Sequence, residues 1–186
     1  MPGASEVLVV VDVQNGFVRE ESAHVVPIIV DLVTKWESTG RGVIFTRYFN
    51  HPGSLFERLI NWNKMQGPPE TDLVPELLPL AERGIVFDKR TYSLLNAEGI
   101  ELVRSRGWTD IYVCGIATES CVLKTAVDAF EVGLTPWLIE DASASHAGPV
   151  AHEAGLLVTR RFIGEGQIIS TAEALDRIAA SPQTVA

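Results

Sequence analysis

The sequence has few cysteines, no long hydrophobic run and no cluster of basic residues, and each absence excludes a class of protein. Cys114 and Cys121 are the only cysteines in 186 residues, too few for the disulfide framework of a small secreted domain. No apolar stretch approaches the ~20 residues that a membrane-spanning helix needs. The net charge is −9 and the basic residues are dispersed, so no basic stripe is present to bind nucleic acid. We expect neither a membrane nor a nucleic acid as a partner.

The first residues also lack the features of a secretion signal. They lead from Met1 into Glu6 and an apolar run that Asp12 ends, without the basic start and small-residue cleavage site of a signal peptide. A length of 186 residues with 46% hydrophobic content falls within the usual range of one domain. We therefore expect a single domain over residues 1–186, located in the cytoplasm with reduced cysteines.

Short apolar runs alternate with helical patterns along the chain. The run at 7–11 is continuous and β-branched, which is typical of a strand buried on both faces of a parallel sheet. Alternation of this kind predicts an α/β fold, a three-layer doubly wound sheet that is mainly parallel and six-stranded, with ligands bound beyond the carboxyl ends of the strands. The other predicted strands are 42–46, 85–88, 111–115, 135–139 and 167–169, and the predicted helices are 25–38, 99–106, 121–132, 149–162 and 171–180.

The segment 48–82 interrupts this alternation. It holds several prolines and polar residues beside Trp62, so it should form little regular helix. Structureless loops of this length are uncommon unless they have a function. We predict a functional loop or a contact between subunits.

Three side chains with useful chemistry lie at the ends of predicted elements. Asp12 ends the first strand and either caps the next turn or faces the ligand cleft, and Lys89 follows 85–88 and is either solvated or paired with a carboxylate there. Cys121 leads a predicted helix, where free N–H groups and a partial positive charge favour the thiolate. Simple packing is the alternative for Cys121, and it is what we expect for Cys114.

Several common motifs are missing, and their absence narrows the function. No GxGxxG or GxxxxGK[ST] is present to hold phosphates, and no GxSxG marks a serine hydrolase. The two cysteines do not form a CxxC pair, and Leu156 stands where a zinc-binding helix with His152 would need its second histidine. Nucleotide, zinc, redox and serine-hydrolase functions are thereby disfavoured.

Three segments in order along the chain resemble the isochorismatase-like cysteine hydrolase family. They are VLVVVDVQNGF (7–17), FDKRTYS (87–93) and VCGIATESCVLKTAVDAFEVGL (113–134). That family includes nicotinamidases, N-carbamoylsarcosine amidohydrolases and ureidoacrylate hydrolases. The resemblance covers nearly the whole chain and implies the same doubly wound fold.

The resemblance also implies a set of site residues. The catalytic Asp, Lys and Cys of the family fall on Asp12, Lys89 and Cys121. A non-proline cis peptide would join Ile116 to Ala117, and the N–H groups of Ala117 and Cys121 would form an oxyanion hole.

The activity implied is cleavage of the C–N bond of a small amide, carbamoyl or ureido substrate through a thioester, with release of ammonia. Asp12 would take the thiol proton and Lys89 would stabilise the resulting charge. Two alternatives stay open. One is an isochorismatase-type enol-ether hydrolase in which Cys121 is a bystander, and the other is an inactive binding protein of the same fold.

Metal and pocket residues can be compared with the family in the same way. Nicotinamidases bind a divalent metal through a DxH motif and a further His after the second strand, whereas the segment 46–52 reads TRYFNHP with His51 as its only imidazole. We therefore predict no metal and no cofactor. Phe17, Tyr92 and Thr118 are the predicted substrate-pocket residues. The resemblance also implies a homo-oligomer, either a dimer or a tetramer.

Overall fold

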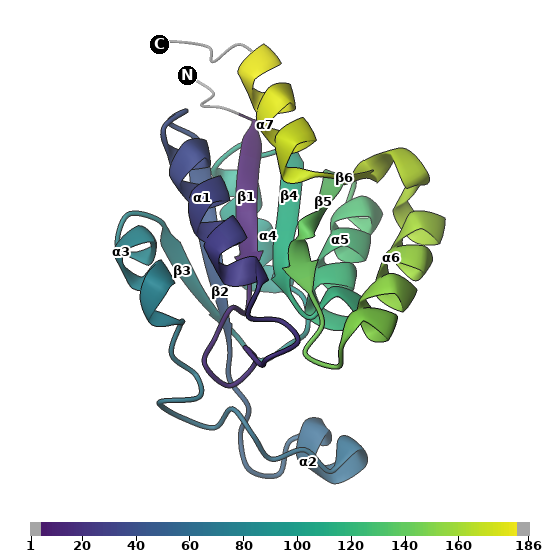
Figure 1. Ribbon diagram of the computed structural model, residues 1–186. Helices are drawn as coiled ribbons and strands as arrows, with labels where there is room; N and C mark the ends of the chain where they lie inside the picture. The colour runs from purple at the N-terminus through teal and green to yellow at the C-terminus, as the bar shows by residue number, and fades with distance from the viewer. Residues whose placement is uncertain (1–4, 182–186) are drawn as a thin grey trace.

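A central parallel sheet covered by helices on both faces forms the three layers of the computed structural model, which describes residues 5–181 (Figure 1). The strand order is β3-β2-β1-β4-β5-β6, and every pairing is parallel. The predicted doubly wound α/β fold is therefore confirmed. The strands are β1 (Glu6–Val11), β2 (Gly42–Tyr48), β3 (Ile85–Lys89), β4 (Asp110–Ile116), β5 (Thr135–Ala144) and β6 (Ile168–Ile169).

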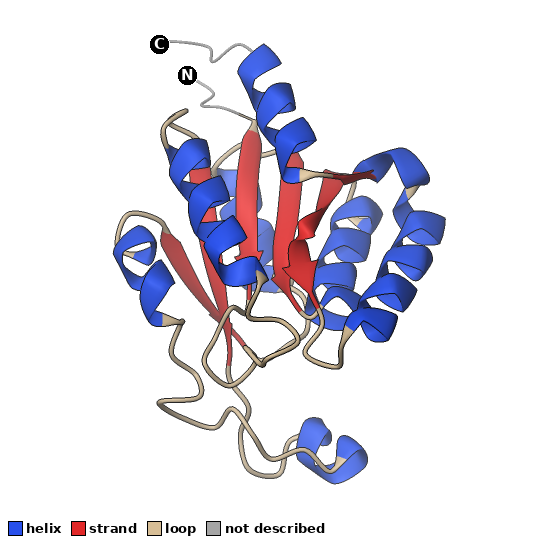
Figure 2. Ribbon diagram, viewed as in Figure 1, coloured by secondary structure: helices blue, strands red, loops and turns tan. Residues whose placement is uncertain are grey.

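Strand β1 shows why helices cover both faces. All its residues are buried, and successive side chains point to opposite sides of the sheet. Leu8 and Val10 pack into the core beneath α1 (Val25–Glu37), α3 (Leu78–Ala81) and α7 (Thr171–Ala180). The alternate valines of β1 pack into a second core beneath α4 (Ala97–Ser105), α5 (Leu123–Glu131) and α6 (Pro149–Ile163). Figure 2 shows these helices in blue on either side of the red strands.

The segment 48–82 holds more helix than the sequence predicts. It contains α2 (Leu55–Ile60), a 3-10 turn at Pro75–Leu77 and the short α3. The prolines do not prevent this, because Pro75 stands in the first turn of its 3-10 segment, where a missing N–H costs no hydrogen bond. Ser54 caps α2 by accepting a hydrogen bond from the Glu57 N–H. In Figure 1, α2 lies below the carboxyl ends of the strands, away from the two helical layers.

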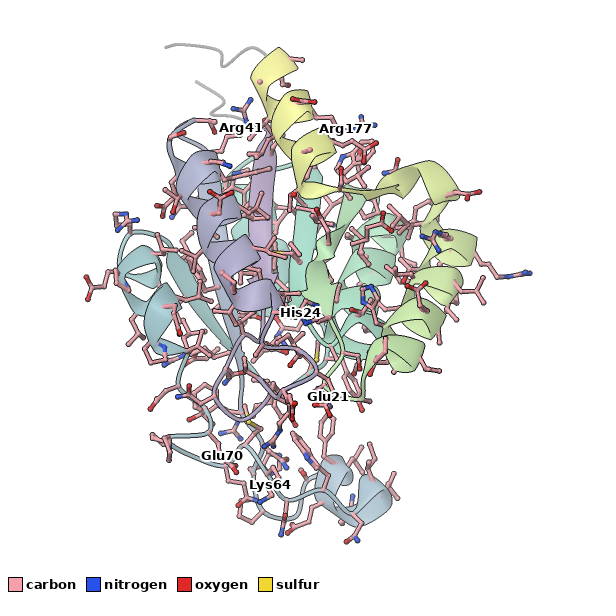
Figure 3. The ribbon with its side chains drawn as sticks, viewed as in Figure 1. Glu21, His24, Arg41, Lys64, Glu70 and Arg177 are labelled. Atoms are coloured by element: carbon pink, nitrogen blue, oxygen red, sulfur yellow. The ribbon has the colours of Figure 1, made fainter. Side chains whose placement is uncertain are left out.

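The two ends of the sheet differ in their charged contacts. At the amino ends of the strands, Arg41 pairs with Glu6 at 3.3 Å and the Arg177 guanidinium lies 4.1 Å above the Trp137 ring. Figure 3 labels both arginines at the end of the molecule opposite α2. These charges therefore stabilise the amino-terminal edge and take no part in a site at the carboxyl edge. Within the described residues, no helix combines the length and apolarity needed to cross a bilayer.

Candidate active site

The reversal of strand order between β1 and β4 creates a crevice at the carboxyl ends of these strands, where doubly wound folds bind their ligands. Asp12 follows β1, Lys89 ends β3, and Cys121 lies in the turn after β4. The Lys89 Nζ donates a hydrogen bond to Asp12 Oδ2 at 2.6 Å, and both residues lie close enough to Cys121 to shift the pKa of its thiol. The structure thus brings these three predicted site residues together.

Asp12 is held rigidly and is completely buried. Its φ of 51° lies in the left-handed region, which aspartate tolerates better than most residues. The Thr46 hydroxyl donates to Asp12 Oδ1 at 2.6 Å and accepts from the Asp12 N–H at 3.1 Å. With Lys89 on Oδ2, each carboxylate oxygen has a charged or polar partner. Thr46 was absent from the predicted site; its only signal in the sequence is a polar residue near the end of a buried strand.

Lys89 has no unused donor. Besides Asp12, its ammonium donates to the carbonyl oxygens of Thr91 at 3.0 Å and Tyr92 at 2.9 Å. A lysine ammonium has three N–H donors, so all are satisfied. The side chain is fully enclosed, and the ammonium lies 5.5 Å from the centre of the Tyr48 ring. Lys89 can therefore affect the site only through its positive charge and its hydrogen bond to Asp12.

Cys121 lies in a π-helical turn, Thr118–Val122, that precedes α5. Single π-helical turns are frequent at functional sites. The peptide bond from Ile116 to Ala117, where β4 gives way to this turn, is cis. Just before the turn, β4 lies so close to its neighbour β1 that a Cβ on Gly115 would lie 2.2 Å from the Val11 carbonyl oxygen. The strand that leads into the turn is therefore closely packed against β1.

The protonation of Cys121 differs from the sequence prediction. The sequence predicts that a helix N-terminus favours the thiolate, but burial raises the pKa of the Cys121 thiol and the nearby Asp12 charge raises it further. Lys89 lowers that pKa, but by less than burial and Asp12 together raise it. The expectation that the surroundings of Cys121 lower its pKa is therefore wrong. The thiol is neutral at physiological pH and needs a base, and Asp12 is the carboxylate beside it.

Alkaline pH should destabilise the protein through its two buried thiols. Burial also raises the pKa of Cys114, and both thiols titrate near their ordinary value of 9.0 once the chain is unfolded. Their contribution to stability is fully present below that value and is lost as the pH rises toward the folded pKa. The loss should be about 1.4 kcal/mol per pH unit for each thiol. Urea unfolding at several pH values from about 8 to about 10.5 measures how steeply the free energy of unfolding falls with pH. The fall should be less steep in Cys114→Ala, which lacks the contribution of one thiol. Equal slopes in wild type and variant would contradict the prediction.

A cavity of about 200 Å³ opens beside Cys121, and its wall is largely aromatic. Two of the predicted pocket residues, Phe17 and Tyr92, line it. The Phe17 ring stacks on Trp62 at 5.9 Å between ring centres, and Tyr48 meets Phe56 edge-on at 5.2 Å. The other lining residues are Ile60, Ile116, Ala117, Ser120, Cys121 and His146.

The prediction that Thr118 is a third pocket residue is wrong, because Thr118 does not line this cavity. It is fully buried, and its hydroxyl hydrogen-bonds His152 Nδ1 of α6 at 2.8 Å. The other aromatic residues of the wall were not predicted individually, although much of the wall comes from the loop 48–82. Phe56 and Trp62 come from the segment 48–82 that was predicted to be functional, and His146 follows β5, where a polar residue at a strand end was the available signal.

The residues after β2 do not suit a metal ion. The His51 ring nitrogen Nδ1 contacts the Pro52 carbonyl oxygen at 3.0 Å, and the His51 side chain is exposed. The Asn50 amide oxygen accepts from the His51 N–H and from the Ser54 hydroxyl. In the part of the chain that the structure describes, no three His, Cys, Asp or Glu side chains gather as a metal site.

Helix α6 packs directly against the turn that holds Cys121, and Gly155 permits this contact. A Cβ on Gly155 would lie 2.7 Å from both the Cα and the backbone N of Glu119. Gly155→Ala should lower the free energy of unfolding by about 1–3 kcal/mol through overpacking, despite the better helix propensity of alanine. Urea denaturation measures this. Gly166→Ala is the matched control, because its Cβ would meet nothing within 4 Å; a stabilised Gly155→Ala variant would refute the close contact.

The chain is similar to one protein family and to several known enzymes. The isochorismatase domain family matches residues 6–173. The ureidoacrylate amidohydrolase RutB of Yersinia enterocolitica is 26% identical over 199 residues, covering 88% of this chain and 85% of that protein. The nicotinamidase of Acinetobacter baylyi is 28% identical over 173 residues, covering 73% and 79%. Nicotinamidase PncA of Bacillus subtilis has a similar structure, with a TM-score of 0.78 at 26% identity over 90% of this chain and 100% of that one.

Proposed function

The chain belongs to the isochorismatase family of hydrolases, whose domain spans its residues 6–173, and from this premise we propose that it is a cysteine amidohydrolase. It would cleave the C–N bond of a small amide, carbamoyl or ureido substrate and release ammonia. The observation that carries this proposal is the position of Cys121, which lies at the wall of a ligand-sized cavity and beside the buried Asp12 carboxylate that Lys89 holds. A nucleophile with an adjacent base is the arrangement that covalent acyl transfer requires.

The first half of the proposed reaction forms a thioester. Asp12 takes the proton of the Cys121 thiol, and the sulfur attacks the carbonyl carbon of the substrate. A C–S bond forms as the carbonyl electrons move to oxygen. The nitrogen then receives the proton that Asp12 holds, the C–N bond breaks, and ammonia leaves. Lys89 supports both states of Asp12, because its ammonium stays hydrogen-bonded to Oδ2 and to two backbone carbonyls.

The second half returns the enzyme to its starting state. Asp12 takes a proton from a water molecule, whose oxygen attacks the thioester carbon. The C–S bond breaks, the thiolate recovers the proton, and a carboxylic acid or carbamate leaves. In both halves the negative oxygen would be stabilised by the N–H groups of Ala117 and Cys121, and both of these residues line the cavity. One such donor is typically worth about 2.7–4 kcal/mol in the transition state.

An ammonia-release screen over small primary amides and carbamoyl compounds tests this function, with intact-mass measurement on quenched reactions. We expect wild-type turnover with a covalent adduct on Cys121, and neither in Cys121→Ser. Cleavage of isochorismate that survives Cys121→Ser would instead establish enol-ether hydrolysis. If neither the amides nor isochorismate were cleaved, the proposed hydrolase activity would be overturned, and a binding protein of the same fold would remain.

A further inference from the structure

The Tyr48 hydroxyl is buried in the candidate site and has no hydrogen-bond partner among residues 5–181. Tyr48 ends β2, is only 3% exposed, and lines the same cavity as Cys121. Buried hydroxyl groups nearly always find a partner in folded proteins. An unpaired hydroxyl at the wall of a cavity therefore points to a group that arrives with the ligand.

Tyr48 is held at its backbone by Gln14, and its buried side chain is enclosed by aromatic rings. Gln14 Oε1 accepts a hydrogen bond from the Tyr48 N–H at 2.8 Å, and Gln14 Nε2 donates to the Tyr48 carbonyl at 3.1 Å. The ring is wedged between Phe17 at 6.1 Å and Phe56 at 5.2 Å. Burial raises the pKa of Tyr48, and ionisation of the nearby Cys121 thiol would raise it further. The hydroxyl thus keeps its proton, and Tyr48 lines the same cavity as the nucleophile.

The wall around this hydroxyl offers little to a negatively charged ligand. Among the described residues that line the cavity, none is a lysine or an arginine, and His146 is the single side chain that could become cationic. The three N–H donors of Lys89 already form hydrogen bonds to Asp12 and to two carbonyl groups. A carboxylate bound among these aromatic rings would be desolvated without an ionic partner, which is strongly unfavourable.

We propose that Tyr48 determines substrate specificity: its hydroxyl donates a hydrogen bond to an uncharged acceptor on a flat, neutral amide, and the site discriminates against carboxylate-bearing analogues. The cavity of about 200 Å³ suits a molecule with a single ring, since an apolar cavity of roughly 150 Å³ holds benzene. The aromatic wall favours stacking on such a ring. This inference rests on the proposed amide hydrolysis only for the placement of the scissile carbonyl at Cys121.

Binding to the Cys121→Ser variant tests the proposal without turnover. The probes are the three pyridinecarboxamide isomers, which carry a ring-nitrogen acceptor, and benzamide, which is nearly the same shape without it. Adding Tyr48→Phe should weaken the best-binding pyridinecarboxamide by about 3–10-fold in calorimetry, the usual size of one neutral hydrogen bond. Benzamide should change by less than about twofold. Tyr112→Phe is the protein control, because that buried ring packs between Trp36 and Trp137 in the core beneath α1.

Charge is tested with isophthalamide and its carboxylate twin, 3-carbamoylbenzoate, which differ little in shape. The neutral compound should bind at least tenfold more tightly. The proposal would be overturned if isophthalamide and 3-carbamoylbenzoate bound equally well. It would also be overturned if Tyr48→Phe weakened benzamide as much as the pyridinecarboxamide, or if no pyridinecarboxamide bound. In an enzyme with Cys121 intact, Tyr48→Phe should raise KM for the pyridinecarboxamide and leave kcat nearly unchanged. Probes that bind as expected but release no ammonia from wild type would reject the proposed hydrolysis and leave the assignment of Tyr48 in place.

Discussion

Replacing Lys89 with methionine is expected to lower the free energy of unfolding by about 3–5 kcal/mol at neutral pH, the usual cost of removing one partner from a buried ion pair. The cause is the charge left behind on Asp12, whose side chain is 0% exposed. The carbonyl oxygens of Thr91 and Tyr92 would lose their donor in the same variant. Urea unfolding followed by circular dichroism measures the loss.

Two further variants separate this cause from a general loss of packing. Arg47→Met breaks the Arg47–Asp88 pair. Its 2.7 Å contact is nearly as short as the 2.6 Å of Lys89–Asp12, but its side chains are 30% and 52% exposed, so the loss should be only about 0–1 kcal/mol. Adding Asp12→Asn to Lys89→Met removes the uncompensated charge and should recover part of the lost stability. Asparagine suits this test because it also tolerates the left-handed backbone at residue 12. Similar losses for Lys89→Met and Arg47→Met would refute the buried-charge explanation.

The fold could be predicted because each level of the sequence indicates the same answer. The buried run of β1 has β-branched residues on both faces, which only a parallel sheet between two helical layers accommodates. Because the strands are parallel, the carboxyl ends of β1, β3 and β4 share one edge of the sheet. Asp12, Lys89 and the turn before α5 lie at that edge for this reason.

The details of the site could not be read in the same way, because they depend on packing between distant segments. Thr118 faces His152 and not the cavity because α6 closes against its turn. Trp62 and Phe56 reach the cavity through the path of the loop 48–82, which no periodicity specifies. The Cys121 pKa was misjudged because the sequence shows a nearby helix start but not the burial that dominates.

The largest effect is expected at Cys121. Cys121→Ser should lower kcat for the best amide substrate by on the order of 10⁴–10⁶-fold, the scale on which hydrolases lose activity with their nucleophile. Cys114→Ala should leave kcat within about twofold, because Cys114 is enclosed in β4 and packs into the core beneath α1. Ammonia release under saturating substrate compares the variants, with enzyme concentration fixed by intact mass.

Asp12→Asn then distinguishes a functional unit from two independent residues. If Asp12 is the base that takes the proton of the Cys121 thiol, as proposed above, removing it disables the same step that Cys121→Ser removes. The double variant Asp12→Asn/Cys121→Ser should therefore be no slower than Cys121→Ser alone, as found for catalytic groups that act as a unit. If the fold-losses in kcat of the two single variants multiplied in the double variant, Asp12 would act on a separate step. A Cys121→Ser variant within about a hundredfold of wild type would remove the thioester from the mechanism, because no described residue beside Cys121 on the cavity wall offers a second thiol.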